Sequence, residues 1–505
     1  MKTIKINPAD NVAVAIEPLK AGETIHIEGQ TITLNNDVPA GHKILLSDLV
    51  EGENVIKYGY PIGHLKESHK QGDFICHDHI KTNLSGLLDY EYKPVGKEEL
   101  TNPAYEEWFP KEQLTFQGYR RKNGDVGIRN EVWIVPTVGC VNGIVNQLAE
   151  KLKQEVASQL STPLRIVAFP HNYGCSQLSE DHENTRKVLR DLVLHPNAGA
   201  VLVVGLGCEN NQPDQFEQLL GDYDKERIRF MVTQKVEGDE VEEGMKTLRE
   251  LYALAAKDQR EAIPLSKLRV GLKCGGSDGF SGITANPLLG VFSDFIVNQG
   301  GTTVLTEVPE MFGAETILMN RCETPELFQQ TVKLVNDFKQ YFLSHGEPVG
   351  ENPSPGNKAG GISTLEEKAL GCTQKCGKSA VRGVLSYGER LSVKGLNLLS
   401  APGNDLVAAT ALASSGCHIV LFTTGRGTPF GTFVPTLKVS TNSTLAKNKP
   451  TWIDFNAGTI VEGEPMVEVF KRFVQKVIEI ASGELTWNEK KNYQEIAIFK
   501  NGVTL

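Results

Sequence analysis

The residue run that offers the most chemistry spans positions 273–282 and directly follows the apolar run 268–272. Cys274 supplies a thiol, Ser277 a hydroxyl and Asp278 a carboxylate, all set among glycines that let the backbone approach a ligand closely. These groups can bind a metal ion or move a proton. An apolar run that ends in small polar residues is typical of a buried strand whose carboxyl end forms part of a site.

Two further apolar runs end in the same way. Residues 201–205 lead into a loop that contains Cys208, and residues 419–422 lead into a loop that contains Thr424, Arg426 and Thr428. The three loops predict one shared cleft at the carboxyl ends of parallel strands.

A small anionic ligand fits the last of these loops. The planar fork of Arg426 and the hydroxyls of Thr424 and Thr428 suit a carboxylate, and Lys358, in a turn rich in Pro and Gly, is a second cation for it. The alternatives are a structural ion pair for Arg426 and a solvated side chain for Lys358. A nucleotide is not expected, because the glycine spacing matches neither GxGxxG nor a P-loop.

Four residues are candidates for proton transfer. His42 follows a glycine turn, His171 stands at a strand end near Cys175, Asp278 lies in the loop described above, and Glu307 follows the apolar run 302–306. The plain alternatives are a structural histidine for His42 and His171 and, for Glu307, an acid that complements a helix N-terminus.

Cysteines and histidines supply the candidate metal ligands. Nine cysteines, odd in number and scattered, do not form a disulfide framework and indicate a reducing, cytoplasmic setting. Those that follow an apolar run beside a glycine, among them Cys140, Cys175 and Cys274, are expected to bind iron or zinc as thiolates. A second set, His77 and His79, alternates along one extended segment. Cys322, Cys372, Cys376 and Cys417 are interpreted as small buried apolar residues.

The composition excludes several classes of protein. The chain has 505 residues, enough for two or three domains, and its net charge of -10, without a long basic run, argues against a nucleic-acid partner. No apolar stretch approaches the roughly 20 residues of a membrane helix, and the N-terminus lacks a signal-peptide core. We therefore expect no membrane partner and a small-molecule ligand, with a homo-oligomer as a further possibility.

The elements that position these residues follow from the hydrophobic periodicity. Residues 1–83 contain short alternating segments between glycine turns and predict a β-rich module; residues 84–113 predict a linker, so that the module would be tethered rather than fused. Beyond it, apolar strands alternate with helical stretches such as 181–194 and 327–342. This pattern predicts a parallel-sheet α/β body in two domains, residues 114–260 and 261–505.

Six residue blocks together resemble the altronate and galactarate dehydratase family: residues 137–143, 172–177, 205–212, 274–287, 352–361 and 423–431. The likeness runs essentially the whole length. The N-terminal module resembles the SAF (antifreeze-like) domain of that family, and residues 205–212 and 306–315 are closest to its altronate branch. One departure lies at positions 76–79, where relatives often have His-x-His-Asn and this chain has Cys-His-Asp-His.

The resemblance implies a hydro-lyase that converts D-altronate to 2-dehydro-3-deoxy-D-gluconate and water, with a divalent metal. Ferrous iron is expected, manganese is the alternative, and one ion with mixed ligands is preferred to an iron–sulfur cluster. The chemistry agrees, because removing a proton next to a carboxylate needs a metal to stabilise the charge, a base for C2 and an acid for the C3 hydroxyl.

Three other functions stay open at this point. The substrate could be galactarate or another sugar acid, the chain could be a non-catalytic sugar-acid sensor, or it could be a nicotinamide-dependent oxidoreductase. The last is favoured only by strands that precede glycine loops.

Overall fold

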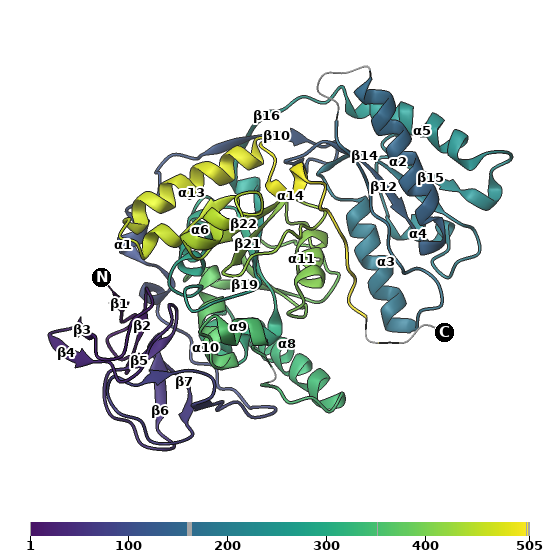
Figure 1. Cartoon of the computed structure of the whole chain (residues 1–505). Helices are drawn as coiled ribbons and strands as arrows, with labels where there is room; N and C mark the ends of the chain where they lie inside the picture. The colour runs from purple at the N-terminus through teal and green to yellow at the C-terminus, as the bar shows by residue number, and fades with distance from the viewer. Residues whose placement is uncertain (1, 159–163, 351, 501, 503–505) are drawn as a thin grey trace.

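The computed structural model describes residues 2–158, 164–350, 352–500 and 502. Figure 1 shows an N-terminal module of short strands, a second body with a four-stranded sheet, and a third body with a seven-stranded sheet between them. No helix among the described residues is long and apolar enough to cross a membrane.

The N-terminal module consists of short antiparallel strands. One sheet has the order β1–β2–β5–β8, and two smaller sheets contain β3–β4 and β6–β7–β9. Its strands are β1 (Thr3–Ile4), β2 (Val12–Ala15), β3 (Thr24–Ile27), β4 (Gln30–Thr33), β5 (Lys43–Leu45), β6 (Asn54–Lys57), β7 (Tyr60–Leu65), β8 (Phe74–Ile75) and β9 (Ile80–Lys81). The β-rich module expected from the alternating segments is confirmed.

Residues 84–113 connect the module to the rest of the chain and contain only η1 (Lys97–Leu100) and α1 (Pro103–Glu106). They lie against the third body rather than free of it. The hydroxyl of Tyr90 donates to Glu315 Oε1 at 2.6 Å, and that of Tyr92 donates to the carbonyl of Cys322 at 2.6 Å.

The second body is built on parallel strands in the order β13–β12–β14–β15. These are β13 (Ile166–Ala168), β12 (Glu131–Pro136), β14 (Ala198–Gly205) and β15 (Ile228–Val232). Alternate residues of β12 and β14 point to opposite faces. One face packs on α2 (Asn142–Ala157) and α5 (Glu240–Ala255), and the other packs on α3 (Ser179–Val193).

The third body is a seven-stranded parallel sheet in the order β19–β20–β18–β17–β21–β22–β23. Its strands are β19 (Val381–Leu385), β20 (Gly395–Leu399), β18 (Thr302–Leu305), β17 (Arg269–Cys274), β21 (Ile419–Thr424), β22 (Thr436–Ser440) and β23 (Phe455–Asn456). Its main apolar core packs the sheet on α6 (Ala285–Asn298), α8 (Pro325–Ser344) and α13 (Met466–Ala481), while α11 (Asp405–Ser414) belongs to the core shared with the second body. The predicted α/β architecture is confirmed.

A small antiparallel sheet joins the second and third bodies. In it, β10 (Thr115–Arg120) pairs with β11 (Val126–Gly127) on one side and with β16 (Glu261–Pro264) on the other. Arg129 also forms a buried ion pair with Glu489 at 2.7 Å, with the Glu489 side chain fully buried. These contacts link the two bodies at several sequence positions.

A buried ion triad fixes the N-terminal module to the third body. Lys43 and Lys57 of the module each donate to the carboxylate of Glu367, at 2.8 and 2.7 Å, and all three side chains are at most 1% exposed. Glu367 lies on α10 (Leu365–Thr373). Although burial alone would raise the pKa of Glu367, the two ammonium groups lower it to about 2. The module is therefore docked on the body, and the expectation of a tethered module is wrong.

Replacing Glu367 by Gln should undock the module, because it leaves two buried lysines without a counter-charge. Breaking a buried ion pair by removing one partner typically costs about 3–5 kcal/mol. Scanning calorimetry should show a lower-melting transition for the module. Asp48→Asn removes an exposed pair with Lys70 in the same module and should leave the curve unchanged.

The same triad sets an acid limit. The pKa of Glu367 in the folded protein lies below the ordinary value of about 4.3. Its contribution to the free energy of unfolding is therefore complete above about pH 4.3 and is lost as the pH falls toward 2. If Glu367→Gln and Asp48→Asn lowered the melting temperature of the module equally, the ion triad would not be the contact that docks it.

Candidate active site

The candidate active site begins at the carboxyl ends of two neighbouring strands, β17 and β21. Cys274 lies opposite Thr423 in this parallel pair, so the loops that follow both strands emerge side by side. The backbone N–H groups of Gly425 and Arg426 donate to the carbonyl of Gly276 at 3.0 and 2.9 Å. Two of the three glycine loops thus meet. The third, which contains Cys208, follows β14 in the sheet of the second body.

Asp278 organises the loop after β17. Its carboxylate accepts hydrogen bonds from the hydroxyls of Ser281 and Thr441, the side-chain amide of Asn442 and the backbone N–H of Phe280, at 2.9–3.1 Å. No cation pairs with it among the described residues, and burial raises the pKa of Asp278. Asp278 therefore holds several segments together at one point.

Close backbone contacts bring the module onto this loop. The N–H of Gly279 donates to the carbonyl of Gly360 at 2.8 Å. A Cβ atom built on Gly279 would lie 2.0 Å from the carbonyl oxygen of Gly41, and one built on Gly361 would lie 2.3 Å from the same oxygen. We call Gly41, Gly279, Gly360 and Gly361 the glycine junction. Only glycine permits three chain segments to approach so closely.

His42 enters the site from the module, directly beside the glycine junction. Its side chain is buried, its Nδ1 lies 3.2 Å from the carbonyl of Ala40, and its ring lies against Phe74. Burial lowers the pKa of His42, and the neighbouring charges of Lys43 and His77 lower it further. The imidazole is thus neutral near pH 7 and can accept a proton.

Two cations approach the glycine junction from the third body. Lys358 lies on α9 (Pro355–Ala359), whose Asn357 side chain donates to the carbonyl of Ser277 at 2.9 Å, and Arg426 follows β21. Lys358 is half-buried and Arg426 is exposed; neither has an ion-pair partner in the described part of the chain. Both charges are available to an anionic ligand.

The hydroxyls predicted beside Arg426 help to shape its loop. Thr424 Oγ1 accepts from the N–H of Gly427 at 2.8 Å, and Thr428 Oγ1 accepts from the N–H of Phe430 at 3.3 Å. Thr424 is fully buried and Thr428 is half-buried. A contact of either hydroxyl with a ligand stays a prediction.

A group of potential metal ligands lies in the module, near His42. One ligand atom from each of Cys76, His77 and Asp78 falls within 4.8 Å of the others. The Nε2 of His77 lies 3.5 Å from Asp78 Oδ1, and its Nδ1 is buried without a hydrogen-bond partner in the described structure. His79 is next to this set but is not part of it: its Nδ1 lies 3.6 Å from the Cys76 sulfur and already accepts from the backbone N–H of Cys76 at 3.1 Å. Sulfur, nitrogen and oxygen donors together suit a divalent transition metal.

A second thiol group lies deeper in the third body. Cys274 and Cys372 have their sulfur atoms 3.2 Å apart, and both sulfurs lie 3.2–3.3 Å from Glu310 Oε2. Cys140 and Cys175, predicted as ligands together with Cys274, instead follow β12 and β13 of the second body, and Cys140 is exposed. The predicted set is not brought together because these strands belong to a different sheet.

Sequence reasoning missed Cys372, Lys273 and Lys375. Cys372 sits in an apolar helical context that resembles ordinary core, and a lysine at the end of a strand carries no local sign of burial. In the structure Lys273 and Lys375 both pair with Glu307, and Lys375 Nζ lies 2.8 Å from Glu307 Oε2. Only the fold reveals this network.

Two predicted proton-transfer residues, Glu307 and His171, have their polar side-chain atoms occupied by contacts within the protein. Glu307 accepts from the two buried lysines and from the N–H of Cys274 at 3.0 Å, and its backbone is left-handed at φ 66°. His171 lies in the second body, with Nε2 2.8 Å from the carbonyl of Pro136 and Nδ1 accepting from the N–H of Tyr173. Burial lowers the pKa of His171 to about 4. These bonds occupy both ring nitrogens of His171.

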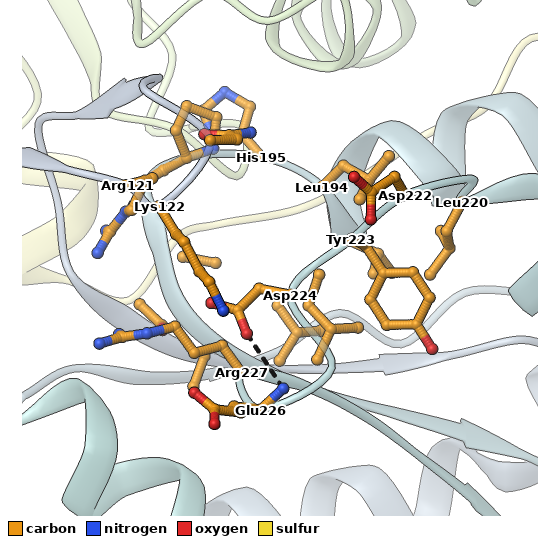
Figure 2. A pocket seen from close by; sticks show the side chains of 18 of the residues that line it. Arg121, Lys122, Leu194, His195, Leu220, Asp222, Tyr223, Asp224, Glu226 and Arg227 are labelled. Carbon is orange, nitrogen blue, oxygen red and sulfur yellow. Dashed lines mark hydrogen bonds between the residues drawn. The ribbon is translucent and has the colours of Figure 1, made fainter.

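A separate cavity of about 680 Å³ opens between the β10–β11 hairpin and the second body (Figure 2). Two of its arginines, Arg121 and Arg227, share one carboxylate, that of Asp258, at 3.0 and 2.7 Å. None of the predicted site residues lines it. The glycine junction, and not this cavity, is therefore the candidate site considered below.

Comparison with known proteins matches nearly the whole chain. The altronate/galactarate dehydratase SAF domain matches residues 1–83, the second domain of D-galactarate dehydratase/altronate hydrolase matches 118–256, and the C-terminal region of D-galactarate/altronate dehydratase matches 265–504.

Full-length relatives agree with these matches. The altronate dehydratase of Bacillus subtilis (strain 168) is 55% identical over 503 residues, covering 99% of each chain. That of Escherichia coli (strain K12) is 54% identical over 505 residues, covering 100% of each. The galactarate dehydratase (L-threo-forming) of E. coli K12 is 34% identical over 498 residues, which is 95% of this chain and 93% of the relative.

Gly279→Ala should disrupt the site, because the new methyl group would sit 2.0 Å from the carbonyl oxygen of Gly41. We expect the module to shift away from the loop, with a lower melting temperature and a loss of ligand binding in titration calorimetry. Gly143→Ala is the matched control, since a Cβ there meets nothing within 4 Å and alanine favours the helix by up to about 1 kcal/mol. A Gly279→Ala protein as active as the control would argue against the junction.

Proposed function

Because the chain belongs to the altronate/galactarate dehydratase family, and so is a hydro-lyase, we propose that it removes water from D-altronate to give 2-dehydro-3-deoxy-D-gluconate. The resemblance expected from the residue blocks is confirmed by the full-length matches. The observation that carries the proposal is the glycine junction, which gathers His42, Asp278, Lys358 and Arg426 beside the ligand group of Cys76, His77 and Asp78.

The two unpaired cations bind the substrate carboxylate in this proposal. Arg426 presents a planar fork that can hold both carboxylate oxygens, and Lys358 adds a point charge from the opposite loop. Asp278 does not touch the substrate here. Its hydrogen bonds fix the loop that carries Gly279 and so orient the other groups.

Membership of this family indicates a metal cofactor, and we propose Cys76, His77 and Asp78 as its ligands. Ferrous iron fits this mixed donor set, and manganese is the alternative. When bound, such an ion would stabilise the negative charge that develops on the substrate as the C2 proton leaves.

His42 is the proposed base. As a neutral imidazole it takes the C2 proton, and the imidazolium then gives that proton to the C3 hydroxyl, which leaves as water. The electrons of the C2–H bond form the C2=C3 double bond, and the resulting enol relaxes to the 2-oxo acid. One histidine can serve both steps because the proton that it gains is the proton that it returns.

We place this reaction in the cytoplasm, acting on a free sugar acid. The nine cysteines are all unpaired, which suits a reducing compartment. Altronate is preferred to galactarate because the altronate dehydratases are 54–55% identical to this chain and the galactarate dehydratase is 34% identical.

An anaerobic assay with ferrous iron and D-altronate tests the function. We expect release of a 2-oxo acid, with altronate preferred to galactarate and mannonate by about tenfold or more, the size of one well-placed polar contact. Removing the metal with a chelator should abolish turnover, and ferrous iron should restore it. Binding without release of a 2-oxo acid would indicate a sensor, and a preference for galactarate would indicate the other branch.

Arg426→Lys should lower kcat/KM by about tenfold or more. Lysine keeps the charge but loses the two-point contact, and a charged hydrogen bond contributes about 1.5–3 kcal/mol. The far-ultraviolet circular dichroism and the melting temperature should stay unchanged because Arg426 is exposed and unpaired in the described structure. Full activity in this variant would mean that the carboxylate is held elsewhere, with Lys358 the next candidate.

The pH profile tests His42. Because the pKa of His42 is lowered by burial, its neutral form prevails at pH 7, and activity should fall only when the pH drops below its ordinary value of about 6.5. His42→Gln should lower kcat and remove this acid limb from the profile of kcat/KM. The limb should persist in Tyr60→Phe, a change at an exposed position of the module. An unchanged limb in His42→Gln would assign the base to another group.

A further inference from the structure

A buried group of two thiols and a carboxylate lies directly behind the proposed active site. Cys274 ends β17, Cys372 lies on α10, and Glu310 lies on η5 (Val308–Met311). The two sulfur atoms are 3.2 Å apart, and each is 3.2–3.3 Å from the same oxygen of Glu310. The three side chains come from three separate elements and face one another, with each residue no more than 4% exposed.

The charges around this group are balanced. The ammonium groups of Lys273, Lys368 and Lys375 face the carboxylates of Glu307, Glu310 and Asp405 in direct ion pairs. With neutral thiols, three positive charges therefore meet three negative charges. A divalent cation that replaced the two thiol protons would keep the same net charge, because two thiolates would balance it.

We propose that Cys274, Cys372 and Glu310 form a second cation site, separate from the site proposed in the module, for a divalent metal that prefers sulfur, such as Zn²⁺ or Fe²⁺. Thiolate ligands select such metals, and two sulfurs with one carboxylate oxygen supply three of the four positions of a tetrahedral site. On binding, two metal–sulfur bonds form and two protons pass to solvent. No oxidation state changes.

The surroundings of the group indicate from which side a cation would reach it and which elements the cation would hold together. Asp405, paired with Lys273, has a side chain that is 35% exposed, and a Cβ built on the half-buried Gly403 would lie 3.5 Å from Glu310 Oε1, so the surface is close to the group on this side. A cation held here would tie the end of β17, η5 and α10 together. It would thereby fix both the start of the loop that contains Asp278 and the helix that carries Glu367.

Cobalt(II) is the probe for this site. The protein is first changed by Cys76→Ser, so that the module contributes no thiolate, and Co²⁺ is added anaerobically. We expect an intense near-ultraviolet sulfur-to-cobalt band at one equivalent, and a higher melting temperature with Zn²⁺. X-ray absorption of the zinc form should count two sulfur ligands at about 2.3 Å. No band, or no more than one sulfur, would overturn the proposal.

Matched variants of two buried cysteines separate this site from other buried thiols. In the same background, Cys372→Ser should remove most of the band and weaken binding at least about tenfold, since even outer partners of metal ligands contribute that much. Cys376→Ser changes a buried cysteine whose sulfur donates to the carbonyl of Thr373 and should leave the band intact. Equal effects of the two changes would overturn the proposal, as would a native disulfide between Cys274 and Cys372 in non-reducing peptide maps. The X-ray absorption count needs neither variant and decides the question if Cys372→Ser does not fold.

Discussion

The carboxylate of Glu367, shared by Lys43 and Lys57 in a site closed to solvent, is the interaction on which the rest of the arrangement depends. Three charges are buried there, and both ammonium groups depend on the single carboxylate between them. The ion triad therefore determines where the module can dock, and a small displacement would leave a charge without its partner. His42 follows directly from this docking, because Lys43 is its neighbour in the chain.

The glycine junction adds a second and closer contact between the module and the third body. Charges fix the module on α10, but the contact between Gly41, Gly279 and Gly361 brings the three backbones within the distance that a single methyl group would occupy. Cations from one body and a histidine from another can then face the same ligand. The proposed mechanism thus depends on an interface between two folding units rather than on one loop.

The predicted acid Glu307 illustrates how burial changes the role of a residue. From its position after an apolar run it resembled a group that enters a cleft, whereas in the structure it binds Lys273 and Lys375. A carboxylate between two buried ammonium groups already has its charge compensated, so it stabilises the strand ends on which the loops begin. Glu310, close to Cys274, likewise has its charge compensated by a buried lysine, Lys368.

The sequence by itself determined the local structure and pointed to the loops from which the site is proposed. Alternation within residues 1–83 predicted a β-rich module, the helical period over 181–194 predicted α3, and the polar residues after β17 and β21 pointed to a site, because these signals arise from neighbours in the chain. Which strand ends meet was decided only by the tertiary structure. It placed β12 and β13 in another sheet from β17, which separated Cys140 and Cys175 from Cys274, and it brought Cys372 and Lys375 to Cys274 from about 100 positions away. Contacts of that range depend on packing and buried charge, and no local pattern encodes them.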